Sequence, residues 1–592
     1  MGGSAPADRR AFVGALKRRS GFADAHGGMD LPAAQGIRIP TATWVAARTR
    51  SWARSIDVPT TVAVSTAVVL GLFVRLVHVL RADFPLNDGG LFYVMMRDLQ
   101  RAHFALPAYT SYNGGQIPFA YPPLPFYVGA ALSDLLHVSP IQVLRFLPLA
   151  LNVLTIPAVC LLARAILRSK FMAIVAAFAF ALLPGSFDRT IVGGGLTRAL
   201  GLLFAVLALY ALHQMYVTRR RRFVVTSSLL AGLATLCHPE AALFVAYSAP
   251  LLLIAYGRAR RGLADSALAA AGAVLVSAPW WAASLLRYGP GPLLAAGGTG
   301  GQSPYFWLPL LTFGFTGEPF AQILAVLGLL GVLSSVAGRK LLLPAWVAVI
   351  FLVDPRAGST FAMVPLAMLV AIGLTDVVLP RFSQLAAWLR DDTRWTEAWA
   401  RERGVRLVLT AVAAMGMFGA IGASLPFTSP LHALSPQARD AMQWVRAQTP
   451  ADARFLIVNA SGWNDEPTIE WFPALADRVS MTTAMGREWT GTGAYQRKAD
   501  QNQALQECAD ATARCLAEWS ARTGIRFTYA YLPKGPIMGV VSRTDCCGAL
   551  RESLRSSPDY SVVYDGPGAT IFRRRADPPS TSAAPNGSSP LR

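Results

Sequence analysis

The sequence contains few charged residues for its length. Asp, Glu, Lys and Arg together make up 15% of its 592 residues, against roughly 25% in an ordinary soluble domain. Apolar residues make up 53% of the chain, and the mean hydropathy is +0.39. The shortage of charge argues against a soluble enzyme and favours a protein that lies largely within a membrane.

Acidic residues are the scarcer kind of charge, 34 against 54 basic residues, so the net charge is +20. On composition alone, this excess also fits a nucleic-acid-binding protein. The basic residues, however, gather in every second loop between apolar runs, as they do in cytoplasmic loops. From residue 429 onward the chain is nearly neutral, with 18 basic and 16 acidic residues. We therefore predict no nucleic-acid partner, and a multi-pass plasma-membrane protein with a cytoplasmic N-terminus and an extracytoplasmic C-terminal domain.

Apolar runs of spanning or near-spanning length recur along the chain. Two of them, 171–184 and 341–353, are short, which fits tilted spans or segments buried among neighbouring helices. We predict eleven transmembrane helices, at 59–80, 141–163, 171–184, 196–217, 223–237, 239–257, 264–283, 319–337, 341–353, 358–379 and 407–427.

The apolar runs divide the chain into four parts. We expect a disordered cytoplasmic tail over 1–58, a transmembrane domain over 59–428, an extracytoplasmic domain over 429–576 and a disordered Pro/Ser-rich tail over 577–592. The first outer loop, 81–140, is long. The sequence lacks an internal repeat, and its first apolar run begins too far from the first residue for a cleavable signal peptide.

Strand-like and helix-like segments follow one another in the outer domain. FLIVNA at 455–460 and FTYAYL at 527–532 are typical of strands. The segments 435–448 and 501–523 are typical of helices. The predicted fold class is therefore an α-helical polytopic membrane protein, with about eleven transmembrane helices and a C-terminal extracytoplasmic α/β domain.

Cysteine is scarce, with six residues in the chain. Cys160 and Cys237 lie in or at the end of membrane helices, where they act as small apolar packing residues. The other four lie in the outer domain, where an oxidising compartment permits disulfides; they are Cys508, Cys515, Cys546 and Cys547. If 501–523 is one unbroken helix, the first two are roughly 10 Å apart, and they must pair with the 546–547 segment instead. A zinc site is the alternative, but the CxxC spacing that would support it is missing.

Ionisable residues stand in the outer loops, where the chemistry is expected. Asp88 follows the first apolar run and precedes a Gly-Gly turn, so its carboxylate can face a cavity at the membrane surface. The alternative is that Asp88 caps a helix that begins at Gly89 or Gly90.

Further ionisable residues stand in three other outer turns: Asp188, Arg189 and Arg198; His238 and Glu240; Asp354 and Arg356. Such residues at helix ends are often merely solvated. His238 and Glu240 in particular could cap the helix that follows Pro239.

Together these motifs resemble the GT-C superfamily of multi-spanning glycosyltransferases, which use polyprenyl-phosphate-linked sugars. The resemblance rests on Asp88 near the start of a long first outer loop, Tyr121-Pro122-Pro123 with Tyr127, the GGGLTRAL helix and the HPE turn, and it covers about 60–380. The segment 470–489 resembles that of bacterial GT-C-like membrane proteins of poorly defined substrate. Asn87-Asp88 stands where parts of the superfamily have two acids, which weakens the expectation of an obligatory metal ion.

The resemblance implies a role for each site residue. Asp88 is expected to deprotonate an acceptor hydroxyl, with Asp188 assisting it or orienting the acceptor. Arg198, Arg356 and His238 are expected to bind the donor phosphate. Residues expected to line the substrate site are Tyr121, Tyr127 and Glu240. In a metal-dependent version, a divalent cation, Mg or Mn, would be held by Asp88, Asp188, His238 and Glu240.

The expected partners are a polyprenyl-phosphate-linked sugar, a glycan, lipid or protein acceptor, and the lipid bilayer. Two other classes of function fit part of the sequence. A transporter or flippase of lipid-linked sugars would place ionisable groups near the bilayer midplane and often has inverted repeats. A non-catalytic membrane protein could instead bind an envelope glycan, with Trp463, Trp471 and Trp489 either stacking on sugar rings or packing in the core of the outer domain.

Overall fold

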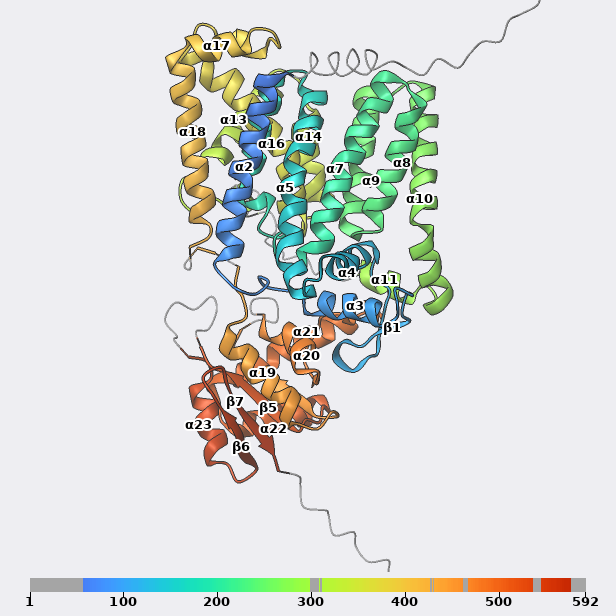
Figure 1. Ribbon diagram of the computed structural model, residues 1–592, viewed down its shortest axis with the longest axis vertical. Coiled ribbons are helices and arrows are strands. Elements are labelled where there is room, and N and C mark those ends of the chain that lie inside the picture. Colours follow the sequence, from blue (N-terminus) through green and yellow to red (C-terminus); the bar gives the residue numbers. More distant parts are fainter. Residues whose placement is uncertain are drawn as a thin grey trace, which may run out of the picture. The chain divides into compact units, whose positions relative to one another are not determined.

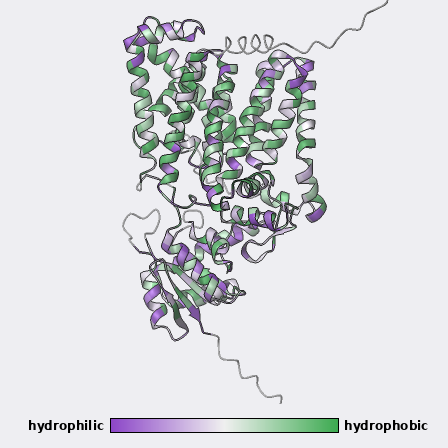
Figure 2. Cartoon of the chain, viewed as in Figure 1, coloured by the Kyte–Doolittle hydropathy of each residue, from purple (hydrophilic) through white to green (hydrophobic). Residues whose placement is uncertain are grey.

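The computed structural model describes residues 57–575, except 299–307, 309, 310, 313, 426, 427, 430, 462–466 and 536–544. The two tails expected at 1–58 and 577–592 fall outside these residues, apart from 57 and 58. Long helices dominate the described chain, and a small sheet follows them near the C-terminus (Figure 1). Apolar residues run along the long helices, whereas polar residues gather at the helix ends and in the C-terminal domain (Figure 2).

Seven helices of the described residues are long and apolar enough to cross a membrane. They are α2 (Val58–Leu80), α5 (Pro140–Leu167), α7 (Gly195–Thr218), α9 (Pro239–Tyr256), α10 (Arg260–Tyr288), the segment Gly358–Arg381 and α18 (Arg403–Gly422). The Gly358–Arg381 segment is built from α15 (Gly358–Phe361), α16 (Met363–Ile372) and the irregular turns that follow. An eighth span is reached if α13 (Ile323–Ala337) and α14 (Leu342–Val353), bent by 118°, are counted together.

The predicted number of eleven spans is therefore not confirmed, although every one of the eleven apolar runs forms a helix. Four runs give helices of 12 to 15 residues, namely α6 (Lys170–Leu182), α8 (Arg221–Thr235), α13 and α14. A helix rises about 1.5 Å per residue, so none of the four reaches the ~30 Å of a bilayer core alone. α6 is buried along nearly its whole length, as expected of a helix enclosed by its neighbours.

One charged side chain is buried within the helical bundle. Arg75, in α2, is fully buried and donates hydrogen bonds to the side chains of Asn152 and Ser186 and to the carbonyl of Ala181. Asn152 in turn donates to the carbonyl of Ser186. A buried guanidinium is tolerated only where its donors are matched in this way. We therefore interpret Arg75 as a structural tie between α2, α5 and the turn after α6.

The first loop, 81–140, is itself structured. It contains α3 (Gly90–Arg101), a two-stranded ribbon of β1 (Tyr109–Thr110) and β2 (Ile117–Pro118), and α4 (Leu124–Leu136). Buried Asp98 accepts hydrogen bonds from the hydroxyls of Thr110 and Ser111 and from the backbone of Ser111, which ties α3 to the ribbon. The loop is thus a small folded layer that lies against the C-terminal domain.

The C-terminal region forms the predicted α/β domain. Its five-stranded mixed sheet has the order β4-β3-β5-β7-β6, with β3 parallel to β4 and β5, and β7 antiparallel to β5 and β6. The strands are β3 (Arg454–Ile457), β4 (Val479–Ser480), β5 (Tyr529–Pro533), β6 (Tyr560–Asp565) and β7 (Ala569–Arg574). The helices are α19 (Pro436–Gln448), α20 (Thr468–Ala476), α21 (Ala494–Gln506), α22 (Ala513–Thr523) and α23 (Gly548–Ser556).

Alternate strand residues face two different helix layers, as the period of two in a strand requires. Phe455 and Ile457 of β3 pack with α19 and α20 and with the first loop. Leu456 packs with α21, α22 and α23. The α19/α20 face of the sheet is therefore the face that meets the first loop.

The expected helix 501–523 is wrong in one respect, because it breaks in the middle. α21 ends at Gln506, a 3-10 turn covers Glu507–Asp510, and α22 begins at Ala513 after extended residues at 511 and 512. The break brings the Cα atoms of Cys508 and Cys515 to 5.6 Å, and the two are joined by a disulfide. In one continuous helix the same two Cα atoms would lie roughly 10 Å apart, too far for a disulfide.

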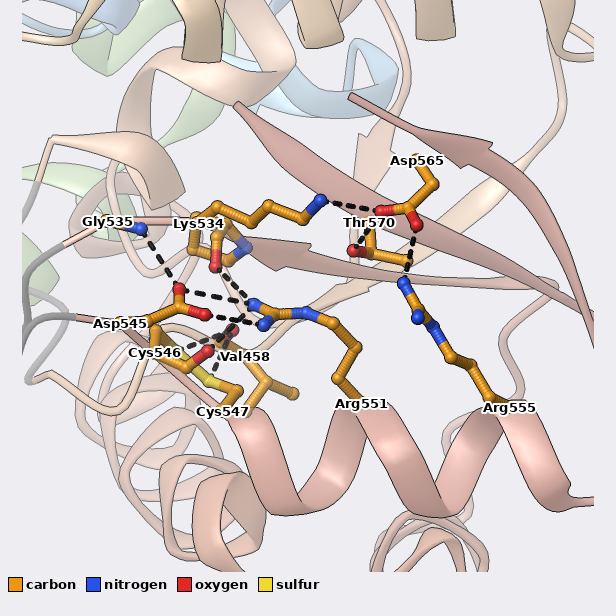
Figure 3. A network of polar contacts seen from close by, with 11 residues as sticks. Val458, Lys534, Gly535, Asp545, Cys546, Cys547, Arg551, Arg555, Asp565 and Thr570 are labelled. Atoms are coloured by element: carbon orange, nitrogen blue, oxygen red, sulfur yellow. Dashed lines mark hydrogen bonds and ion pairs between the residues drawn. A yellow bond between two sulfur atoms is a disulfide. The ribbon is translucent and has the colours of Figure 1, made fainter. Parts of the chain in front are cut away.

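The remaining two cysteines of the C-terminal domain are bonded to each other just before α23. Both Cys546 and Cys547 lie against the carbonyl of Val458, at the end of β3 (Figure 3). Arg551 holds the same corner together, since its guanidinium donates to Asp545 at 2.7 Å and to the carbonyl of Cys546 at 2.8 Å. Disulfides among the four outer cysteines were expected, and the structure gives their pairing as 508–515 and 546–547.

This pairing predicts the thiol content of the protein. Cys160 and Cys237 are free and buried, so the denatured, unreduced chain should have two reactive thiols and the reduced chain six. Labelling with a maleimide reagent before and after reduction, followed by mass spectrometry of the peptides, measures both numbers. Six thiols before reduction would contradict the disulfides.

The alternation of basic loops predicts the orientation of the bundle. Reporter fusions after Arg261, at the start of α10, should report the cytoplasm, and fusions after Ser429, beyond α18, should report the outside. An alkaline phosphatase and green fluorescent protein pair gives opposite signals on the two sides. The reverse signal at either position would overturn the expected orientation.

Candidate active site

Asp88 lies in a tight turn that presses against the start of α7. Its carboxylate forms an ion pair with Arg198 at 2.6 Å and accepts a hydrogen bond from the backbone of Gly194 at 3.0 Å. A Cβ atom on Gly194 would lie 2.2 Å from the Asp88 carboxylate, and one on Gly193 would lie 2.1 Å from the Asp88 carbonyl. The glycine run before α7 is therefore what lets the backbone approach Asp88.

Asp88 does not cap α3, which was the alternative interpretation. The helix begins at Gly90 with Gly89 as its N-cap residue, and no side chain of the Asp88 turn caps it. The carboxylate points instead to the N-terminus of α7, where the positive end of a helix stabilises an anion. Asp88 keeps 22% of its side chain exposed, so a substrate group can reach it.

A second carboxyl, which the sequence analysis did not select, comes from the C-terminal domain. Glu470, in α20, accepts a hydrogen bond from the backbone of Gly89 at 2.9 Å. The neighbouring Trp471 donates from its indole to the carbonyl of Asn87 at 2.8 Å, and Tyr112 donates to the carbonyl of Glu470 at 2.6 Å. The C-terminal domain thus holds the Asp88 turn through two consecutive side chains.

Of the two carboxyls, Asp88 and Glu470, only one carries the negative charge. Burial and the nearby charge of Asp88 raise the pKa of Glu470 well above the ordinary value of a glutamate. Two carboxylates at close range cannot both ionise easily, and the one with a cationic partner keeps the charge. Asp88 has Arg198 as its partner, so we interpret Asp88 as the ionised member and Glu470 as the protonated one.

Asp188 and Arg189 lie in the turn before α7. Arg198 donates to the carbonyl of Arg189 at 2.9 Å, and Arg189 donates to the carbonyl of Arg356 at 2.9 Å. Burial raises the pKa of Asp188, opposed by the charges of Arg189 and Arg198. The turn therefore joins the Asp88 region to the Arg356 region.

His238 caps α9, as the alternative interpretation had it. Its Nδ1 atom accepts a hydrogen bond from the backbone of Glu240 at 3.2 Å. Burial lowers the pKa of His238 to about 4, so the imidazole is neutral at neutral pH. Glu240 lies between two positive or polar partners, 3.7 Å from His238 and 3.7 Å from the Nε atom of Arg356. Arg356 is 55% exposed at its side chain, which makes it more accessible than Arg198 at 29%.

Asp354 and Tyr127 were also expected near the site, and their surroundings differ. Asp354 is buried and accepts a hydrogen bond from the backbone of Ala357 at 3.2 Å; burial and the charge of Glu240 raise its pKa to about 6. Tyr127, expected to line the site, stacks on Phe104 with ring centroids 6.4 Å apart. Among the described residues, no ring contact or hydrogen bond ties Tyr127 to the Asp88 turn.

Tyr121, by contrast, lies at the centre of an aromatic cluster. Its ring meets those of Phe92, Phe126, His238 and Trp489 at centroid distances of 5.2 to 6.0 Å. Trp489 belongs to the C-terminal domain, so this domain contacts the site at a second place. Trp471 is fully buried, which supports the core-packing interpretation for that residue, and Trp463 falls outside the described residues.

The ligand set named for a metal-dependent version is not assembled in this arrangement. Among the residues that the structure describes, no group of three or more His, Cys, Asp or Glu side chains could hold a metal ion. The Asp88 carboxylate already accepts hydrogen bonds from Arg198 and from the backbone of Gly194. The lone pair of the His238 Nδ1 atom accepts the backbone N–H of Glu240 at the start of α9. The set of Asp88, Asp188, His238 and Glu240 thus does not fit a divalent cation in this arrangement.

A family model described as 6-pyruvoyl-tetrahydropterin synthase related domain, membrane protein, matches residues 120–417. This range is half of the chain. The chain belongs to this family. The range that defines the family carries Arg198, His238, Glu240 and Arg356, and it is helical in the described residues. Asp88 and the C-terminal domain lie outside it. No curated protein matches the sequence.

Solved structures similar to this family member are membrane glycosyltransferases of the GT-C superfamily. The oligosaccharyltransferase AglB of Archaeoglobus fulgidus, in complex with an inhibitory peptide and a dolichol-phosphate, has a TM-score of 0.52 and 16% identity, over 80% of this chain and 69% of that one. ArnT of Cupriavidus metallidurans, bound to undecaprenyl phosphate, has a TM-score of 0.51 and 15% identity, over 87% of this chain and 98% of that one. The arabinofuranosyltransferase AftD from Mycobacteria has a TM-score of 0.53 and 17% identity, over 87% of this chain and 40% of that one. The resemblance to the GT-C superfamily is thereby confirmed at the level of the fold.

The protonated state of Glu470 can be tested by the pH dependence of stability. A carboxyl whose pKa is raised by folding binds a proton in the folded state that the unfolded chain has released, so its contribution to stability is lost as the pH rises above about 4.5. Glu470→Gln keeps an oxygen for the Gly89 amide but cannot titrate. Between about pH 5 and about pH 8, the melting temperature of the variant in detergent should therefore fall less than that of the wild type.

The control for this measurement is Glu552→Gln, which changes an exposed glutamate of the same domain. It should follow the wild-type curve. Equal slopes for the wild type and Glu470→Gln would mean that Glu470 is ionised in the folded protein.

Proposed function

We propose that the protein is a membrane glycosyltransferase, which moves a sugar from a polyprenyl-phosphate donor to an acceptor outside the cytoplasm. The observation that carries the proposal is the Asp88 turn: a partly exposed carboxylate, held by an arginine and a helix N-terminus, at the loop end of a GT-C-type bundle. Two of the similar structures, AglB and ArnT, were solved with a dolichol-phosphate and with undecaprenyl phosphate. These complexes support the donor class.

Asp88 is the residue assigned as the base. In the proposed step, the acceptor hydroxyl gives its proton to Asp88 while its oxygen bonds to the anomeric carbon, and the bond between that carbon and the phosphate oxygen breaks. Arg198 and the Gly194 amide fix the carboxylate without covering it. Protonated Glu470 leaves the negative charge on Asp88, and Asp188 orients the acceptor.

The leaving lipid phosphate needs positive charge. Arg356 is the better-placed cation, because its side chain is more exposed than that of Arg198. A guanidinium can bind phosphate oxygens with two parallel hydrogen bonds. His238, neutral and adjacent to Glu240, supplies a hydrogen bond rather than charge. Arg198 contributes its charge at the junction of the two halves of the site.

The experiment has two stages. Mass spectrometry of envelope glycans, lipids and glycoproteins from cells with and without the gene identifies the missing sugar and the class of acceptor. Purified protein in nanodiscs is then given the polyprenyl-phosphate form of that sugar, and transfer to the acceptor fraction is measured. No transfer and no missing sugar would refute the proposed function and favour a transporter or a glycan-binding protein.

Asp88→Asn is the decisive variant. The amide keeps the size of the side chain but cannot take up the proton, so turnover should fall by on the order of 10²–10⁴. Asp134→Asn, in the exposed part of α4 of the same loop, is the matched control and should transfer at the wild-type rate. The Asp88→Asn protein should elute from a sizing column and melt as the wild type does. A normally folded Asp88→Asn protein with near-wild-type turnover would remove Asp88 from the mechanism.

A further inference from the structure

The turn Gly486–Trp489 of the C-terminal domain is locked against the first loop. Gly486 has a φ of +86°, and a Cβ atom there would lie 2.6 Å from Ile117 of β2. Arg487 and Trp489 continue as a 3-10 turn closed by hydrogen bonds from their amides to the carbonyls of Ala484 and Gly486. The backbone of the turn therefore has little conformational freedom, which fixes the positions from which its side chains project.

Three consecutive side chains of this turn, those of Arg487, Glu488 and Trp489, carry screened polar atoms without a hydrogen-bond partner among the described residues, and those of Glu488 and Trp489 adjoin the candidate active site. The Oε2 atom of Glu488 and the Nε1 atom of Trp489 are both screened from solvent, and neither has a hydrogen-bond partner among the described residues. Trp489 is 3% exposed, whereas Glu488 keeps part of its side chain accessible. Leaving a buried donor or acceptor unmatched is costly, and in native proteins such a pair calls for an explanation.

The turn stands beside the candidate active site. The ring of Trp489 meets that of Tyr121 at 5.4 Å, and Tyr121 meets His238 at 6.0 Å. Burial raises the pKa of Glu488 to about 7, and the charge of Arg356 opposes this shift. The unmatched donor and acceptor therefore lie next to the residues assigned to the donor phosphate, on a different domain.

The chemistry of the pair selects its ligand. A carboxylate accepts hydrogen bonds from hydroxyls, and an indole N–H donates to them. The carboxylate also repels a phosphate. The pair is therefore suited to a neutral, hydroxyl-rich group and unsuited to the anionic end of the donor.

We propose that Glu488 and Trp489 form a sugar-hydroxyl binding site of the C-terminal domain, which holds the acceptor beside Asp88. This inference rests on the proposed function only in identifying the bound glycan as the acceptor, because the site itself requires only a neutral glycan. The acceptor is then a carbohydrate, or carries one at the reacting end, rather than a bare protein or lipid hydroxyl.

Kinetics of two conservative variants test the proposal. Glu488→Gln replaces the carboxylate by an amide, and Trp489→Phe removes only the N–H group and one ring. Each should raise the acceptor KM about tenfold and leave the donor KM unchanged, as expected for one lost hydrogen bond. The controls are Glu507→Gln, an exposed glutamate of the same domain, and Trp444→Phe, whose ring packs on Tyr564. Both should keep the wild-type constants.

The pH dependence supplies a readout that a merely structural role would not move. Glu488 loses its charge as the pH falls through about 7, so the wild-type acceptor KM should rise there, whereas that of Glu488→Gln should stay flat. The charged or titratable groups that act on Glu488 from the neighbouring elements are Arg356, Tyr112, Tyr121 and Tyr495. Arginine and these buried tyrosines keep their protonation state near neutral pH.

Direct binding separates this proposal from the proposed function. Native mass spectrometry of the Asp88→Asn protein in nanodiscs, with neutral oligosaccharides of glucose, galactose, mannose and arabinose, requires no transfer. Binding of one of them that Glu488→Gln and Trp489→Phe weaken about tenfold supports the site even if no sugar is transferred. The proposal is overturned if the two variants bind and use acceptor as the wild type does, or if they change only the donor KM, which would make Glu488 a positioning residue for Arg356.

Discussion

The contact between the Asp88 turn and the glycines before α7 is the constraint on which the site depends. Gly194 can donate to the Asp88 carboxylate only because no side chain stands between the two backbones. Arg198 follows four residues later, one helical turn into α7, and so reaches the same carboxylate from above. The close approach thus places a helix N-terminus and a guanidinium on one anion. Both stabilise the charged form of Asp88, which a base must have before it can accept a proton.

The C-terminal domain completes this arrangement and is not a mere appendage. Glu470 and Trp471 hold the Asp88 turn through hydrogen bonds with the backbone of Gly89 and Asn87, and Trp489 packs on Tyr121. Because Asp88 already has the cation, Glu470 is left as the neutral partner, and its proton removes a repulsion that would otherwise push the turn away. The geometry of the Asp88 carboxylate is therefore shared by a membrane helix and a domain almost 400 residues away in the sequence.

Local patterns in the sequence predicted the helices well and the spans less well. All eleven apolar runs are helical, but a run of 13 residues such as α6 is apolar because its neighbours enclose it, and hydropathy alone cannot distinguish burial in protein from burial in lipid. The break at Thr512 had a signal, since threonine is a favoured N-cap residue and Ala513 begins α22. It was outweighed by the apolar spacing on both sides, and the pairing of Cys508 with Cys515 was excluded as a consequence.

The candidate site shows the same division between local and distant information. Asp88, Arg198, His238 and Glu240 could be selected because each stands at the end of an apolar run. Glu470 could not, because nothing in the sequence around it reveals that α20 meets the Gly89 amide. The metal set failed for a related reason. Residue types alone made Asp88 and His238 plausible ligands, whereas the structure commits their atoms to Arg198 and to the cap of α9.

The two site arginines are compensated to different degrees, and this difference gives them different uses. Arg198 is bound tightly to Asp88 at 2.6 Å, so releasing it to a phosphate would leave the base without its partner. Arg356 lies 3.7 Å from Glu240 and is more exposed, with 55% of its side chain accessible, so a phosphate can reach its guanidinium without disturbing the pair of Asp88 and Arg198. In the proposed reaction, Glu240 would then take Arg356 back as the lipid phosphate departs. An accessible cation that is separate from the Asp88 pair favours both capture of the donor and release of the product.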